Sequence, residues 1–171
     1  MKTPTHPWPS PDALASFYGR IELDHDGLPT NRWESNHLTQ IALPYPMRLA
    51  WETDAVVRRI TCHREVAPSL ARILGAILAH HHGSVEAVRA AGLDLYGGCY
   101  NYRPVRGSNT LSLHAYGAAI DLDPDHNAMN TKGGKGKMPQ VVVDFFKAEG
   151  WAWGGDFKTR QDPMHFEAVK R

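Results

Sequence analysis

The segment Ser112-Leu-His-Ala-Tyr-Gly-Ala-Ala-Ile-Asp121 is the part of the chain from which the fold is predicted here. Large apolar residues alternate with small or acidic ones over 119–123, which is the pattern of a half-buried strand with Asp121 on its polar face. His114 lies seven residues earlier, so a straight strand would aim its side chain at the opposite face. Gly117 stands between them and can supply a bend or bulge that turns His114 back toward Asp121.

A second segment, Asp162-Pro-Met-His-Phe-Glu167, reads as another strand. Its apolar side chains can face a core while His165 faces the other way. Pro163 has no N–H, which suits the start of a strand or an edge strand. If the two strands are neighbours, they present His114, Asp121 and His165 on one face of one sheet.

Two histidines and one aspartate are a standard set of protein ligands for a catalytic zinc ion, whose fourth position is left to water. Asp162 then remains as a base for that water. Taken singly, each of these residues is more often a hydrogen-bonded structural histidine or a turn cap. Four of them, in this order and at these intervals, favour a zinc site.

The pattern Ser-x-His-x-x-Gly-x-Ala-x-Asp, followed by Asp-x-x-His-Phe, resembles the zinc D-alanyl-D-alanine peptidases. These include VanY-type carboxypeptidases, VanX-type dipeptidases and phage L-alanyl-D-glutamate endolysins, and their zinc fold is similar to that of the hedgehog signalling domain. The resemblance covers residues 95–168. It implies that His114, Asp121 and His165 are zinc ligands and that Asp162 is the catalytic carboxylate.

Four further residues are candidates around this site. Arg103 matches the family's active-site arginine, and a guanidinium suits the binding of a substrate carbonyl or carboxylate through two N–H groups. Arg106 is the competing candidate for that role. Ser112 can orient His114 or meet the substrate, and Glu167 lies on the ligand side of its strand, where it can hydrogen-bond a zinc histidine.

The resemblance implies a zinc-dependent peptidase acting on bacterial peptidoglycan stem peptides. Two reactions stay open, namely release of a terminal D-alanine from a D-alanyl-D-alanine end and cleavage of the L-alanyl-D-glutamate bond. The alternative is a non-catalytic zinc-containing binding domain of hedgehog-like fold. Asp162 discriminates between them, because a pure binding domain has no need of a base beside the zinc water.

Length and composition limit the remaining possibilities. The chain has 171 residues, 42% of them hydrophobic, and a formal net charge of +1. It is long enough for a sizeable core, and its near-neutral charge gives no argument for nucleic acid binding. No signal-peptide run or membrane-spanning stretch is visible. We therefore expect a soluble monomer made in the cytoplasm, without membrane insertion, that acts on the cell wall after release or export.

The expected fold is α+β, a small antiparallel sheet carrying the zinc site with a few helices packed on one face. Residues 1–36 are predicted to be an irregular N-terminal arm and residues 37–171 a zinc peptidase domain. Cys62 and Cys99 are predicted as buried free thiols or, alternatively, as a disulfide. The expected elements are strands at 38–43, 56–62 and 93–102, helices at 65–81, 85–91 and 139–149, and a Gly- and Lys-rich loop at 130–137.

Overall fold

The computed structural model describes residues 7–131 and 136–171. Residues 1–6 of the predicted arm and residues 132–135 of the predicted loop lie outside this range. The helices and strands, in chain order, are η1 (Pro11–Ala13), α1 (Leu14–Phe17), α2 (Asn31–His37), β1 (Leu38–Leu49), β2 (Glu52–His63), α3 (Ala67–His80), α4 (Val85–Ala90), β3 (Leu95–Gly98), η2 (Leu113–Tyr116), β4 (Ala119–Leu122), α5 (Gln140–Ala148), β5 (Ala152–Trp153), η3 (Gly154–Asp156) and β6 (His165–Glu167), where η marks a 3-10 helix.

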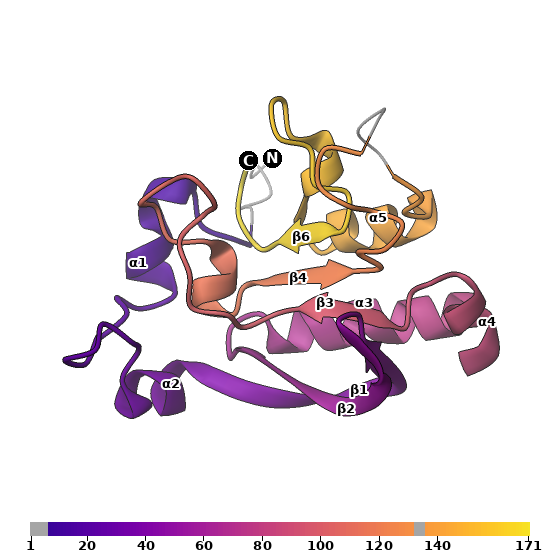
Figure 1. Cartoon of the computed structure of the whole chain (residues 1–171), viewed down its shortest axis with the longest axis horizontal. Helices are drawn as coiled ribbons and strands as arrows, with labels where there is room; N and C mark the ends of the chain where they lie inside the picture. The colour runs from indigo at the N-terminus through magenta and orange to yellow at the C-terminus, as the bar shows by residue number, and fades with distance from the viewer. Residues whose placement is uncertain (1–6, 132–135) are drawn as a thin grey trace, which may run out of the picture.

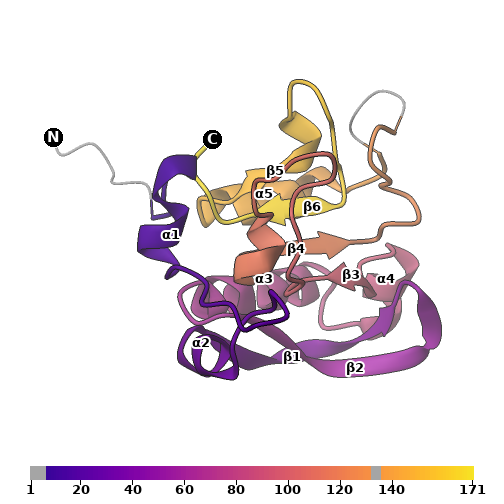
Figure 2. The same cartoon turned by 60° about the vertical axis from the view of Figure 1, so that its left-hand side comes forward.

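The strands form one sheet in the order β2-β1-β3-β4-β6-β5 (Figures 1 and 2). The α+β class is confirmed, but the sheet is mixed because β1 and β3 pair in parallel through Arg48 and Leu49. Parallel neighbours need a crossover connection, which β2, α3 and α4 provide here. The buried Asp94 fixes this pair, because its two carboxylate oxygens accept bonds of 2.6 and 2.9 Å from the Arg48 guanidinium.

Helices cover one face of the sheet, and the candidate site lies on the other. Helix α3 packs on β1 and α5, and α5 packs on β5. Phe166 of β6 stacks on Phe146 of α5 with ring centroids 3.8 Å apart. Neighbouring residues of a strand point to opposite faces, so Asp121 and His165 point away from these helices.

The predicted helices at 65–81, 85–91 and 139–149 are present as α3, α4 and α5. The strand expected at 38–43 continues as β1 to Leu49, because a register shift between Ala42 and Met47 accommodates the intervening prolines. The strand expected at 93–102 is confined to β3.

Residues of the N-terminal segment pack into the common core. Trp8, Leu14 and Tyr18 are buried in the same hydrophobic cluster as the sheet and helices. Figure 2 shows α1 beside the C-terminal end of the chain, and the Tyr18 hydroxyl donates a bond of 2.6 Å to the carbonyl of Ala168, just after β6. Helix α2 also crosses the predicted boundary at residue 36, and the division of the chain into two parts stays a prediction.

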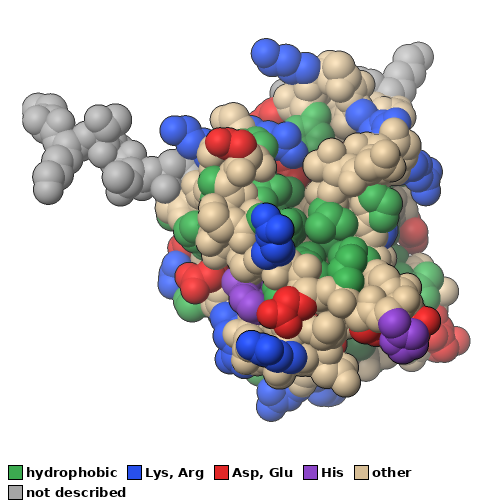
Figure 3. Space-filling model, turned by 90° about the vertical axis from the view of Figure 1, so that its left-hand side faces the viewer, with side chains coloured by type: hydrophobic (Ala, Val, Ile, Leu, Met, Phe, Trp, Pro, Cys, Tyr) green, Lys and Arg blue, Asp and Glu red, His purple; other side chains and the backbone are tan. Residues whose placement is uncertain are grey.

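Figure 3 shows the side of the molecule on which α1 and α2 lie. Hydrophobic side chains gather near its middle, and acidic and basic side chains are interspersed around them. This face therefore presents no extended patch of one charge among the described residues. Within residues 7–131 and 136–171, no helix combines the length and the apolar character needed to cross a membrane.

We expect Tyr18→Phe to lower the free energy of unfolding by about 1–2 kcal/mol, because it leaves the buried Ala168 carbonyl without its donor. Urea denaturation followed by circular dichroism measures the change. Tyr100→Phe is the control, since it removes a bond to Glu34 that is only partly buried. Equal losses from both variants would contradict the structural role assigned to Tyr18.

Candidate metal centre

His114 lies on the short 3-10 helix η2, not on a strand. Ser112 caps the turn, and its hydroxyl accepts a bond of 3.2 Å from the His114 N–H. Gly117 ends the turn with φ +69°, and a Cβ there would lie 2.8 Å from the backbone nitrogen of His63. The predicted redirection at Gly117 is thus present, but as a left-handed turn end rather than a bulge in a strand.

Asp121 and His165 lie on neighbouring strands, as predicted. β4 and β6 are antiparallel, and these two residues are direct partners in the register. Directly opposed side chains on one sheet face have Cβ atoms about 4.5–5.5 Å apart. The prediction that β4 is half-buried is wrong, because all four of its residues are buried. The histidine-bearing turn η2 contacts β4 and places His114 against the polar face that carries Asp121.

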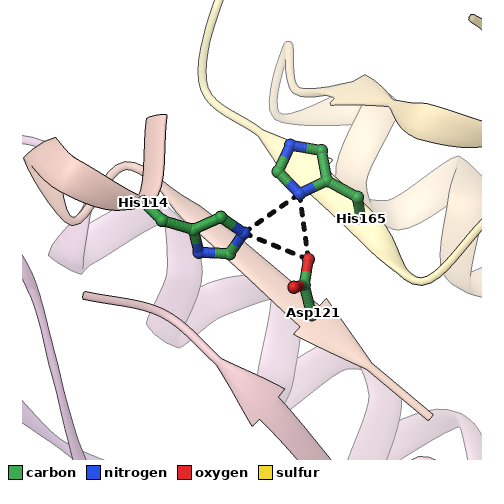
Figure 4. A group of neighbouring side chains, drawn as sticks. All are labelled: His114, Asp121 and His165. Carbon is green, nitrogen blue, oxygen red and sulfur yellow. Dashed lines mark hydrogen bonds and ion pairs between the residues drawn. The ribbon is translucent and has the colours of Figure 1, made fainter. Parts of the chain in front are cut away.

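Three ligand atoms converge from these elements (Figure 4). The Asp121 Oδ1 atom lies 3.2 Å from Nε2 of His114 and 2.9 Å from Nδ1 of His165. The two nitrogen atoms are 3.2 Å apart. The ligand atoms of a tetrahedral zinc ion with bonds of about 2.0–2.1 Å are about 3.3 Å apart, so this triangle is close to the size that zinc requires.

The other nitrogen of each imidazole is already bonded to the protein. Nδ1 of His114 lies 2.8 Å from the carbonyl oxygen of Cys99, which can only accept. Nε2 of His165 lies 3.1 Å from a carboxylate oxygen of Glu167. With protons on these outer nitrogens, the inner nitrogen of each ring keeps a free lone pair directed at the triangle.

Three lone-pair donors at such short distances need a proton or a metal cation between them. Burial disfavours a charged imidazole, but hydrogen bonds to Asp121 and Glu167 outweigh it and raise the pKa of His165 to about 10. Burial likewise opposes ionisation of Asp121, and the two histidines hold its pKa below the usual range. The donor set therefore attracts positive charge strongly, and two imidazoles with one carboxylate suit zinc.

Asp162 lies beside this triangle. Its backbone N–H donates to the carbonyl of Gly154 at 2.9 Å, and its carbonyl accepts from the N–H of His165 at 3.0 Å. A Cβ at Gly154 would lie 2.3 Å from the Asp162 carbonyl oxygen, so a glycine is required there.

The Asp162 carboxylate has an unsatisfied atom. Oδ1 is buried and has no hydrogen-bond partner among the residues that the structure describes. Burial raises the pKa of Asp162, while the charges of His165, His114 and Arg103 oppose that rise. A buried acceptor of this kind needs a donor, which a water molecule next to the triangle would supply.

The two candidate arginines have different surroundings. Pro104 pairs with Leu111 across a short hairpin, and the carbonyl of Arg103 accepts from the N–H of Ser112 at 3.2 Å. Arg103 therefore lies opposite the residue that caps the His114 turn. Its positive charge acts on the pKa of Asp162. Arg106 is held through its backbone, since its carbonyl accepts from the Arg160 guanidinium at 2.7 Å.

Sequence reasoning missed three contributors to the site. The carbonyl of Cys99 gives no side-chain signal, and Arg171 was not predicted, although it is four residues after Glu167. Gly154 belongs to the Trp151-Ala-Trp-Gly-Gly155 run, in which the paired glycines were a readable signal of close backbone packing. Cys62 and Cys99 are both buried free thiols, so the disulfide alternative is wrong for this structure.

One other group among the described residues could hold an ion, Asp24-His25-Asp26, but its three residues are exposed. Asp24 Oδ1 accepts hydrogen bonds from the N–H groups of Asp26 and Leu28, as is typical of an aspartate in a turn. The buried triangle is therefore the better candidate.

Comparison with known proteins supports the same segment. Residues 106–168 match the family described as D-alanyl-D-alanine carboxypeptidase, a family of zinc peptidases. No curated protein and no solved structure matches the chain. The matched segment contains all three residues of the triangle as well as Asp162, so the resemblance to the zinc D-alanyl-D-alanine peptidases is confirmed over residues 106–168.

Proposed function

We propose that this protein is a zinc metallopeptidase that hydrolyses peptide bonds in bacterial peptidoglycan stem peptides. The observation that carries the proposal is the buried, unpartnered Oδ1 of Asp162 next to a triangle of lone-pair donors, within the part of the chain that the structure describes. A domain that only binds a partner through a structural metal needs no such carboxylate. The family match supports a peptidase of this kind.

His114, Asp121 and His165 would hold the metal ion in this proposal. When bound there, zinc supplies Lewis acidity and makes water acidic enough to lose a proton near neutral pH. Asp162 accepts that proton and later delivers it to the leaving amine. Its burial favours this role, because the raised pKa makes the carboxylate a better base than an exposed aspartate.

Arg103 is the proposed electrostatic partner of the reacting carbonyl. It is exposed, so its guanidinium is accessible to a substrate, and its charge acts on Asp162. A negative charge that develops on the carbonyl oxygen would be stabilised by its paired N–H groups. Ser112 acts through His114, whose turn it caps.

Two bonds of the stem peptide are candidates for cleavage. A D-alanyl-D-alanine end carries a free carboxylate, which an arginine recognises, and an L-alanyl-D-glutamate bond lies inside the stem. Incubating the zinc-loaded protein with one stem peptide of each kind, and identifying the products by mass spectrometry, tests the proposal and decides between the two bonds. Failure to cleave either peptide would contradict it.

Zinc should stabilise the metal-free protein. At a free zinc concentration about 100 times Kd, binding adds about 2.7 kcal/mol to the free energy of unfolding. That corresponds to several degrees in the thermal midpoint of a chain this long. His165→Ala should abolish the shift, whereas His25→Ala, in the exposed cluster, should leave it unchanged. A zinc-dependent shift that remains in His165→Ala would show that zinc binds at another site.

Asp162→Asn should lower the rate of hydrolysis by about 10²–10⁴-fold, because an amide cannot accept the proton. Elemental analysis should still find zinc, since Asp162 is not one of the three converging ligands. Asp156→Asn is the matched control, as it changes an exposed carboxylate of the same segment. Full activity in Asp162→Asn would show that Asp162 is not the base.

Arg103→Ala should lower kcat/KM by about 10²-fold, the usual effect of losing one donor to a developing oxyanion. Arg106→Ala should change it little, because among the described residues its side chain makes no hydrogen bond or ion pair with the site. Steady-state kinetics on the cleaved stem peptide gives both values. If Arg106→Ala causes the larger loss, the two assignments must be exchanged.

A further inference from the structure

Both oxygens of the Glu167 carboxylate are hydrogen-bonded. It is 3% exposed, and its Oε2 atom lies 3.1 Å from Nε2 of His165. Its other oxygen, Oε1, accepts a bond of 2.7 Å from Nε of Arg171. An ionised carboxylate in this position can only accept, so it selects the form of His165 with a proton on Nε2.

Arg171 is held in place by a second contact. Its guanidinium carbon lies 5.2 Å from the ring centroid of Phe157, at cation–π distance. The Phe157 ring is in turn 6.2 Å from the ring of His165. A ring of contacts therefore lies beside the triangle and joins four residues, Arg171, Phe157, Glu167 and His165. Arg171 itself is half-exposed and lies beyond residues 106–168, where the family match ends.

We propose that Arg171 is a positioning residue for the metal site, holding Glu167 so that it accepts the Nε2 proton of His165 and leaves Nδ1 free for a metal ion. The proposal deepens the proposed function and rests on its metal site. Without Arg171, the buried Glu167 side chain loses the partner that fixes one of its oxygens, and it can turn away from His165. The His165 ring can then leave the orientation that places its Nδ1 atom 2.9 Å from Asp121 Oδ1 and 3.2 Å from Nε2 of His114.

The test is the zinc affinity of the full chain, measured by competition with a chelator. Glu167→Gln should weaken binding by about 10–100-fold and Arg171→Ala by roughly 10-fold, within the range found for partners of metal-bound histidines. Arg171→Lys should recover part of the loss, because it keeps the charge but not the planar Nε donor. Arg72→Ala is the matched control, since Arg72 makes a similar pair with Glu149 away from the site.

A second readout does not require metal. Nitrogen-15 NMR of the metal-free protein reports whether the Nε2 proton of His165 is held in a hydrogen bond. The Nε2–H signal should be sharp in the wild type and in Arg72→Ala, and exchange-broadened in Arg171→Ala. Urea denaturation checks that each variant is folded.

The outcomes separate this inference from the proposed function. If Arg171→Ala binds zinc as tightly as the wild type and keeps the same His165 signal, Arg171 has no positioning role. If the wild type binds no zinc, the proposed function fails. The NMR comparison then still decides whether Arg171 orients Glu167 and His165.

Discussion

The register between β4 and β6 is the constraint on which the site depends. Because side chains alternate along a strand, a slip of one residue would carry Asp121 or His165 to the helix-covered face. Packing on the helix-covered face fixes this register, because Phe166 of β6 stacks there on Phe146 in the core. Gly97 allows β3 to approach from the other side, since a Cβ there would lie 2.9 Å from that of Asp121. Hydrophobic packing thus fixes the distance between two polar side chains that would otherwise have no reason to meet.

The polar groups around the triangle are arranged so that a cation completes them. The outer nitrogen of His114 is bonded to a backbone carbonyl and that of His165 to a carboxylate, so both inner lone pairs are left toward Asp121. Such an arrangement is unstable without positive charge, and a proton on His165 or a metal ion can supply it. Two buried side-chain polar atoms lack a partner in the described part of the chain, Trp33 Nε1 and Asp162 Oδ1. The second borders the triangle, which is where a water would be needed for hydrolysis.

The sequence predicted the members of the candidate site better than their local structure. Asp121 and His165 follow from the two-residue period of short strands, and the structure brings them together. His114 was expected on a bent strand, but the Ser112 cap and the left-handed Gly117 make a 3-10 turn. Those two signals are local and could have been read from the sequence. The parallel pairing of β1 with β3 could not, because it depends on contacts between segments far apart in the chain.

The residues that would do the chemistry and the residues that hold them in place occupy different parts of the chain. The triangle and Asp162 lie within 106–168, the segment that matches the zinc peptidases. Tyr18 bonds the backbone just after β6, and Arg171 holds Glu167, and both lie outside that segment. A short motif can specify ligand atoms, but it cannot by itself fix their positions closely enough to bind a metal. That precision comes in part from hydrogen bonds and packing supplied by residues outside the motif, and we infer that residues 106–168 expressed alone would keep the motif but lose the geometry of the triangle.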